Sequence, residues 1–304
     1  MSKLVPIALM VFNRPDLTIR IMDQLSKSRP PLLYVIADGP RNKEEELLCS
    51  QTREIALNPS WPCQVVPLVR EENVGMVKQF KGGLDYIFEK HENVIFLEDD
   101  ILLSPSFYLF ACEMLERYKN SQNIGHINFS NFYPSHCVEN QHDYFLSTYF
   151  LVWGFATWKK IWKSYDISMP MWKSINQKHI LRTYFHNQRE RKSMKKMFDL
   201  HSYNLNPWTY DYQWLFNCMS KNLFAITPSK NLSLNIGFER TDATHNFGKN
   251  PFAEKLEEVT FPIKHPLNLL RDKAFDKKIS NKSCPNYFNL YFTKIKNRVD
   301  SILK

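Results

Sequence analysis

No apolar run in this 304-residue sequence approaches the ~20 residues that a membrane-spanning helix needs. The six cysteines include no C-x-x-C pair and no zinc-ligand spacing, which is typical of reduced thiols inside a cell. The opening stretch MSKLVPIALMVFNRPD has no small-residue cleavage site, so we expect a first β-strand there rather than a signal peptide. Together these absences predict a cytoplasmic protein.

Glycine is also scarce, and the glycine-rich phosphate-binding motifs are missing. The chain has 8 glycines, with neither a P-loop nor a G-x-G-x-x-G sequence. It also lacks helix-turn-helix, RRM and zinc-finger signatures, so we expect no nucleic-acid partner despite a formal net charge of +9. The positive charge instead favours an anionic ligand or a membrane surface. If the ligand is a diphosphate, a metal ion must neutralise it.

What the sequence does contain is strand–helix alternation through about its first 100 residues. The apolar segments LVPIALMVF, LLYVIAD, CQVVPLVR and VIFLED predict four strands, separated by an amphipathic helix from Pro15, a polar charged helix and a third helix. This pattern predicts an α/β fold with a mostly parallel sheet covered by helices on both faces.

The pattern changes after Ser104-Pro105, where we expect a helix as far as about Tyr118. The segments IGHINFSNF and YFLSTYFLVWGFATW predict aromatic strands, and LFAITPSKNLSLNIGF predicts strand and loop. Helices are expected in ATWKKIWKSY, over residues 177–200, and in WTYDYQWLFNCMSKN.

Polar side chains follow three of the four predicted strands where each strand ends. Asn13-Arg14 follows the first strand, Asp38 the second, and the triplet Glu98-Asp99-Asp100 the fourth. Ligands of open parallel sheets bind beyond these strand ends. Clustered carboxylates there hold a hard divalent cation or perform acid–base chemistry, and the alternative is a solvated acidic turn. The context of the triplet favours a metal site.

These motifs resemble the GT-A (Rossmann-like) glycosyltransferases, in particular the inverting N-acetylglucosaminyltransferase I type and related bacterial enzymes. The likeness rests on the Glu-Asp-Asp strand end, MVFNRPD, VIADGP and YFLVWGFATWKKIW, within about residues 5–245. It implies that Asp100 ligates Mn²⁺ (or Mg²⁺), with Glu98 and Asp99 contacting the sugar or ribose. Arg14 would reach the nucleotide, and Asp38 would bind the base.

The segment NPWTYDYQWLF supplies the expected catalytic base of such an enzyme. Inverting transfer needs a carboxylate opposite the metal-bound diphosphate, and Asp211 is a single carboxylate among aromatic residues. Burial would raise its pKa to a useful value, whereas the alternative is an ordinary acidic residue at a helix N-terminus. Trp208, Tyr210 and Trp214 are expected to stack on sugars, and Trp153 lies in the segment that resembles the family's acceptor side.

The polar loop NIGFERTDATHNFGK contains His245, which the resemblance places near the metal or the diphosphate. A surface histidine is the alternative. The resemblance implies a nucleotide-sugar donor, most simply UDP-linked, and a glycan or lipid-linked oligosaccharide acceptor in bacterial surface polysaccharide synthesis. Two other functions stay open: a nucleotidyltransferase, disfavoured because FNRPDLTIR stands where a glycine-rich loop is usual, and a non-catalytic carbohydrate-binding protein.

We expect a catalytic domain over residues 1–262, with a nucleotide-binding half at about 1–103 and an acceptor half at 104–262. Residues 263–304 form a C-terminal extension that is rich in basic and aromatic residues. Such a composition suits an anionic lipid surface and predicts peripheral association with the inner face of the plasma membrane. In the alternative, the extension packs its aromatic residues on the catalytic domain.

Overall fold

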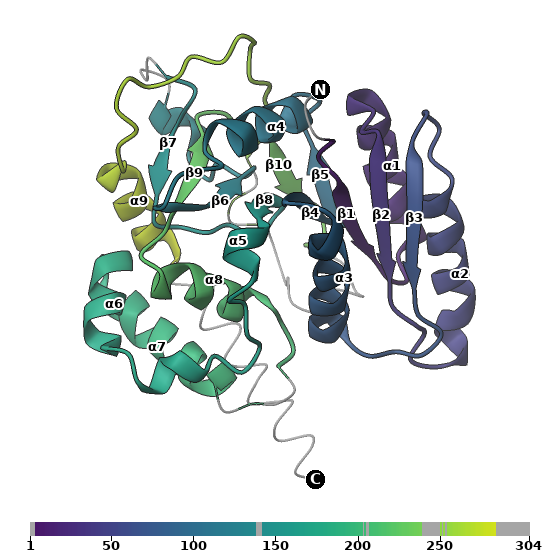
Figure 1. The fold of residues 1–304 in the computed structure, drawn as a ribbon, viewed down its shortest axis with the longest axis horizontal. Helices are drawn as coiled ribbons and strands as arrows, with labels where there is room; N and C mark the ends of the chain where they lie inside the picture. The colour runs from purple at the N-terminus through teal and green to yellow at the C-terminus, as the bar shows by residue number, and fades with distance from the viewer. Residues whose placement is uncertain are drawn as a thin grey trace.

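The computed structural model describes residues 4–137, 142–202, 204, 207–238, 250, 252 and 254–283. Its centre is an eight-stranded sheet with the order β3-β2-β1-β4-β8-β6-β9-β7, and β5 and β10 form a separate two-stranded sheet (Figure 1). The strands are β1 (Ile7–Val11), β2 (Leu32–Ala37), β3 (Gln64–Val69), β4 (Asn93–Glu98), β5 (Ile101–Leu103), β6 (Ile124–Asn128), β7 (Tyr144–Ser147), β8 (Phe155–Trp158), β9 (Phe224–Pro228) and β10 (Ser233–Asn235).

The described helices are α1 (Pro15–Ser28), α2 (Lys43–Leu57), α3 (Met76–Lys90), α4 (Phe107–Arg117), α5 (Lys159–Trp162), α6 (Gln177–Tyr184), α7 (Gln188–Ser202), α8 (Asp211–Ser220) and α9 (Lys273–Ser283). Two short 3₁₀ turns lie at Pro134–Cys137 and Pro170–Lys173.

The first half of the sheet is parallel and buried. β1 pairs with β2 and β4, and β2 pairs with β3, all in parallel. All of β2 is buried, because α1 and α2 pack together over one face while α3 covers the other (Figure 1). Four of the seven neighbouring strand pairs are parallel, which confirms the predicted α/β fold with a mostly parallel, helix-covered sheet.

The sequence around α1 explains how the first functional side chain is placed. Pro15 occupies the first helical turn, where its missing N–H costs nothing. Leu17, Ile21 and Leu25 recur at helical spacing and are buried. Arg14 therefore stands at the N-cap position between β1 and α1, which fixes it at the strand end.

The second half of the sheet is mixed, and several predicted elements are shorter there. β8 is antiparallel to both β4 and β6, and residues 148–154 form a loop between β7 and β8 rather than a continuous strand. The helix expected over residues 177–200 is two helices, because Phe185 is extended and the Asn187 side chain accepts the Arg189 N–H to start α7. Likewise the helix expected from Ser104 begins only at Phe107, after β5.

Two apolar clusters stabilise the fold. The larger one lies between the sheet and the surrounding helices. The smaller one, called here the second cluster, consists of Phe132, Phe145, Tyr149, Phe252, Phe275 and Ile279. The described part of the C-terminal extension therefore packs on the domain, as the packing alternative predicts.

Residues 284–304, which carry much of the predicted membrane-contact composition, lie outside the described residues. Among the helices that the structure does describe, none has both the length and the apolar character that crossing a membrane requires. Association with a membrane surface stays a prediction.

Candidate active site

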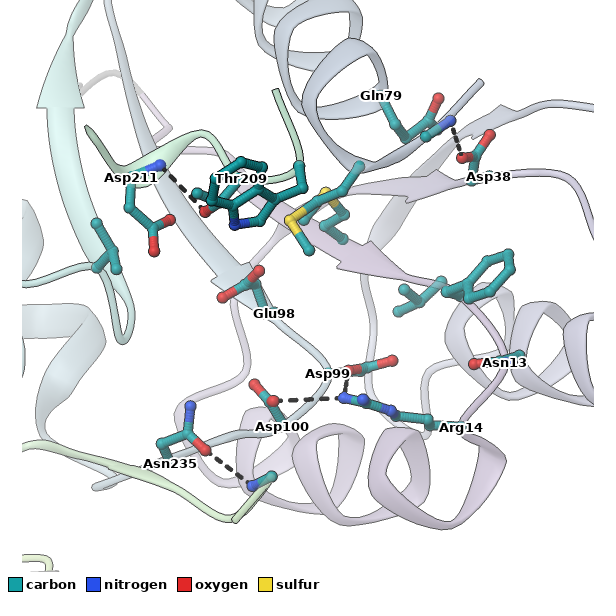
Figure 2. A pocket seen from close by; sticks show the side chains of 18 of the residues that line it. Asn13, Arg14, Asp38, Gln79, Glu98, Asp99, Asp100, Thr209, Asp211 and Asn235 are labelled. Carbon is teal, nitrogen blue, oxygen red and sulfur yellow. Dashed lines mark hydrogen bonds and ion pairs between the residues drawn. The ribbon is translucent and has the colours of Figure 1, made fainter. Parts of the chain in front are cut away.

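A cavity of about 850 Å³ opens at the carboxyl ends of β1, β2 and β4. This volume lies within the range typical of small-molecule sites. All three predicted strand-end features line the cavity: Asn13 and Arg14, Asp38, and the triplet Glu98–Asp100 (Figure 2). The topology brings these segments together because the carboxyl ends of parallel strands share one edge of the sheet.

Arg14 faces the acidic triplet (Figure 2). Its Nη1 lies 3.4 Å from Asp100 Oδ2 and 3.8 Å from Asp99 Oδ1. Both aspartates are buried, with 6% and 8% of their surface exposed. The guanidinium charge therefore offsets part of the repulsion between two neighbouring carboxylates.

Glu98 points into the cavity on the other side of the triplet, between Asp100 and Asp211 in the view of Figure 2. Burial raises the pKa of Glu98, and the charges of Asp100, Asp211 and Asp99 raise it further. Glu98 is therefore the member of the triplet whose pKa depends on Asp211, which lines another part of the same cavity.

Asp211 is the first residue of α8, and its carboxylate lines the cavity. Burial raises its pKa to about 6, while a hydrogen bond from the Thr209 hydroxyl acts in the opposite direction. The carboxylate is thus desolvated, and its charge acts on Glu98 in the same cavity. Its role as the catalytic base stays a prediction. Its position also fits the helix N-terminus alternative, since a negative charge there is favourable.

The predicted sugar platforms divide into two pairs. Trp153 and Trp208 line the cavity, as Tyr212 also does. Tyr210 and Trp214 are only 1% and 0% exposed and do not line it, so the prediction that they stack on sugars is wrong in this structure. These two side chains belong instead to the main apolar cluster.

The packing of these two rings gives the physical reason for the correction. Tyr210 stacks on Phe80 with ring centroids 3.9 Å apart. Trp214 stacks on Phe155, and its indole N–H donates to His126 Nδ1 at 3.0 Å. Because their faces are covered by protein, neither ring can accept a sugar without repacking of the core.

Asp38 serves the structure more directly than the resemblance implied. Its carboxylate accepts three backbone N–H bonds, from Gly39 at 3.0 Å, Val74 at 3.0 Å and Gly75 at 2.9 Å. It thereby ties the end of β2 to the loop before α3. A Cβ on Gly39 would lie 2.3 Å from the Glu72 carbonyl carbon, so only glycine permits this approach. Contact with a nucleobase remains a prediction for Asp38.

Arg41, Glu44 and Glu45 also line the cavity and were not among the predicted site residues. Glu45 binds the Arg41 guanidinium through Nε, at 2.9 and 3.0 Å, and through Nη2, and it accepts the Asn13 amide at 3.0 Å. Arg41 lies over the Phe12 ring, 5.2 Å from its centroid. The Arg41 hydrogen bond lowers the pKa of Glu45. In the sequence this pair stands in RNKEEE, which indicates only a charged helix start.

A divalent cation is expected among the carboxylates of the triplet. In the part of the chain that the structure describes, no group of three His, Cys, Asp or Glu side chains could by itself hold a metal. Asp99 and Asp100 nevertheless present hard oxygen donors, and Mg²⁺ is commonly held by one or two carboxylates plus the phosphates of a substrate. These two residues fit that arrangement. His245, the other expected ligand, lies outside the described residues.

Comparisons with known proteins give only distant likenesses. No protein-family model matches the chain, and no curated protein matches it. Among solved structures, HddC from Yersinia pseudotuberculosis is 13% identical, with a TM-score of 0.33, over 53% of this chain and 80% of that one. UDP-glucose pyrophosphorylase complexed with UDP-glucose is 8% identical, with a TM-score of 0.35, over 74% and 90% of the two chains.

The galactosyltransferase LgtC, solved in complex with donor and acceptor sugar analogs, is 9% identical, with a TM-score of 0.34, over 71% of this chain and 70% of its own. At these TM-scores we draw no function from the likenesses. The cavity and its side chains carry the functional inference instead.

Proposed function

We propose that the chain is a metal-dependent, inverting glycosyltransferase. It would move a sugar from a nucleotide-diphosphate sugar, most simply UDP-linked, to a hydroxyl group of a glycan or lipid-linked acceptor in bacterial surface polysaccharide synthesis. One observation carries the proposal: a carboxylate whose pKa burial raises to about 6, Asp211, lines the same cavity as the acidic triplet at the end of β4.

The donor would bind at the strand ends. Asp99 and Asp100 would hold Mn²⁺ or Mg²⁺ together with the diphosphate, and Arg14 would contact the nucleotide. A bound cation would neutralise the charge that develops on the departing diphosphate. Glu98, which lies between Asp100 and Asp211 in Figure 2, would contact the transferred sugar.

Asp211 would accept the proton of the acceptor hydroxyl. With a pKa of about 6, most of its carboxylate is ionised at pH 7, and it remains basic enough for general-base catalysis. As the acceptor oxygen bonds to the anomeric carbon, the bond from that carbon to the diphosphate breaks and its electron pair leaves with the diphosphate. Attack from the side opposite the leaving group inverts the anomeric configuration.

The acceptor would lie against the aromatic side chains that line the cavity. Trp153 and Trp208 present partly exposed rings to it. Aromatic faces suit the apolar faces of sugar rings, and the nearby Asp211 would receive the reacting hydroxyl.

The test is a screen of UDP-, GDP- and dTDP-linked sugars for binding and hydrolysis, with Mn²⁺, with Mg²⁺ and with EDTA. We expect a metal-dependent rise in thermal stability with one nucleotide class, because a ligand of the folded state stabilises it. Proton NMR of the transfer product from an α-linked donor should show a β-linkage. An α-linkage would overturn the inverting mechanism.

The same screen separates the two competing functions. A nucleotidyltransferase would form nucleoside triphosphate when pyrophosphate is added to a nucleotide sugar. A carbohydrate-binding protein would be stabilised by free glycans and not by nucleotides.

We also propose, as a separate point, that the basic C-terminal extension contacts anionic lipid, where a lipid-linked acceptor would be found. Flotation with anionic liposomes at low and high salt tests it. Equal binding after truncation at Lys264 would contradict it.

A further inference from the structure

Helix α9 belongs to the second cluster, apart from the main core. Phe275 and Ile279 are 0% and 1% exposed and pack in this cluster. The Phe275 ring meets Phe145 edge to face, with centroids 4.8 Å apart, and also approaches Tyr133 at 6.5 Å. A helix from the extension thus supplies apolar contacts that the catalytic domain does not make for itself.

The opposite side of the second cluster is a wall of the cavity. Phe132 and Phe252 stack with centroids 4.1 Å apart and an angle of 15° between the rings. The Trp153 ring lies 4.9 Å from Phe132 and 6.3 Å from Phe252. All three side chains line the cavity, and Trp153 is the one with a partly exposed ring.

Buried polar contacts fix the orientation of α9. Asp276 is 0% exposed and pairs with Arg271 at 2.6 Å. Its carboxylate also accepts hydrogen bonds from the hydroxyl groups of Ser147 at 2.6 Å and Thr148 at 3.0 Å. The Ser280 hydroxyl donates to Glu190 of α7. A buried, satisfied network of this kind specifies a single arrangement.

The last turn of α9 also contacts the wall itself. Lys282 Nζ lies 4.8 Å from the Tyr133 ring centroid and 5.0 Å from that of Phe252. A cation over an aromatic face is attracted to it. The helix therefore supports the wall through both an apolar core and a cation–π contact.

We propose that α9 is a positioning element for the acceptor: through the second cluster, Phe275 holds the Phe132–Phe252 stack and with it the Trp153 ring against which the acceptor binds. This proposal rests on the proposed function, which makes this wall the acceptor side. Since α9 packs on β7, on α7 and in the second cluster, its effect should be confined to the acceptor.

The kinetic experiment compares Phe275→Ala with wild type in the transfer assay. We expect the acceptor KM to rise about tenfold or more, because a displaced platform misplaces the reacting hydroxyl. The equilibrium affinity for the nucleotide sugar should stay within about twofold of wild type, because the acceptor wall does not contact the proposed donor site. Phe275→Leu, which keeps an apolar side chain of similar size, should restore most of the acceptor KM.

Two variants control for general destabilisation. Phe88→Ala removes the same side chain from the main core, where Phe88 is 3% exposed and does not line the cavity. Leu270→Ala changes an exposed residue of the same extension. Both should leave the acceptor KM unchanged. Lys282→Met keeps the apolar stem and cannot open the core, and it should raise the acceptor KM about two- to fivefold even if Phe275→Ala does not fold.

A second readout does not depend on activity. With fluorotryptophan labelling, the ¹⁹F resonance of Trp153 can be assigned by its loss in Trp153→Phe. Phe275→Ala should shift that resonance, and Phe88→Ala and Leu270→Ala should not. An unchanged resonance and an unchanged acceptor KM in folded Phe275→Ala would overturn the proposal. If wild type transfers no sugar while the resonance shifts, the proposed function and the acceptor role fail, and the connection from α9 to Trp153 through the second cluster stands.

Discussion

The two sides of the cavity are built by different means. The proposed donor side consists of charged and polar side chains at the ends of parallel strands, where Arg14 pairs with Asp100 and Asp38 accepts backbone N–H bonds. The proposed acceptor side consists of aromatic rings, such as Trp153 and Phe252, which belong to or pack against the second cluster. The donor side is set by strand position and charge, and the acceptor side by ring packing between distant segments.

The largest expected effect tests whether Asp211 belongs to the chemistry rather than to either binding surface. Asp211→Asn should lower kcat about 10²- to 10⁴-fold, because the amide cannot take the acceptor proton. Nucleotide-sugar affinity, measured by calorimetry, should not change. Asp23→Asn, an exposed aspartate paired with Lys27, is the matched control. Transfer within a few-fold of wild type would remove Asp211 as the base.

The next effect separates the donor side from the acceptor side. Asp100→Ala should weaken metal affinity about 100-fold and abolish the metal-dependent part of nucleotide binding. The fold should persist, because Arg14 retains Asp99 at 3.8 Å and one repulsive charge is gone. Titration of UDP with and without Mn²⁺ checks this, with the exposed Glu116→Ala as control. Equal metal enhancement in wild type and Asp100→Ala would contradict the metal assignment.

A smaller loss on the donor side is expected from Asp38→Asn. The amide cannot accept all three backbone N–H bonds, so at least one buried donor loses its partner, at a cost of about 1–3 kcal/mol of stability. The loop before α3 should loosen, and nucleotide affinity should fall about tenfold while the acceptor KM holds. Urea unfolding and nucleotide titration measure both quantities. A change in the acceptor KM without a change in nucleotide affinity would contradict the assignment of Asp38 to the proposed donor side.

The last expected effect concerns stability and pH rather than binding or turnover. The pKa of Asp211 is raised from 3.8 to about 6, so between these values the folded state keeps a proton that the unfolded state has released. Stability therefore falls as pH rises through this window, by at most about 3 kcal/mol.

Asp211→Asn should remove that loss, so the variant should be more stable than wild type at pH 7.5 and nearly equal to it at pH 3.5. Chemical unfolding at the two pH values measures the difference. An identical pH dependence of stability in both proteins would show that Asp211 is not desolvated in solution.

The donor side could be predicted from sequence because its signals are local. A buried strand followed by carboxylates identifies Asp38 and Asp100 without knowledge of any partner, and strand–helix alternation places both ends at one edge of the sheet. Arg41 and Glu45 were not predicted because a charged run at a helix start is usually solvated. Only the folded structure shows that this hydrogen-bonded pair lines the cavity.

The acceptor side was harder because aromatic residues serve cores and sugar sites equally well. Trp208 and Trp214 stand in one short segment, yet one lines the cavity and the other is fully buried. The difference depends on Phe155, which is distant in sequence from both. No local pattern contains that information. The packing of α9 in the second cluster is likewise a contact between segments more than 100 residues apart, through Phe145 and Phe275.

The close fit at Gly237 has a consequence for the order in which the molecule can assemble. A Cβ at this position would lie 2.3 Å from Asp100 Oδ2, and the Ile236 N–H donates to the Asp100 carbonyl at 2.9 Å. Residues 236 and 237, which close over Asp100, are more than 130 residues later in the sequence than the end of β4. During synthesis the first four strands are therefore complete long before these residues are added. The acidic triplet meets its last neighbours only when β10 pairs with β5, a contact across more than 130 residues. Such long-range closure is slow compared with local helix and strand formation. The newly synthesised chain thus passes through a stage in which the first four strands have been made and the cavity is not yet closed over Asp100.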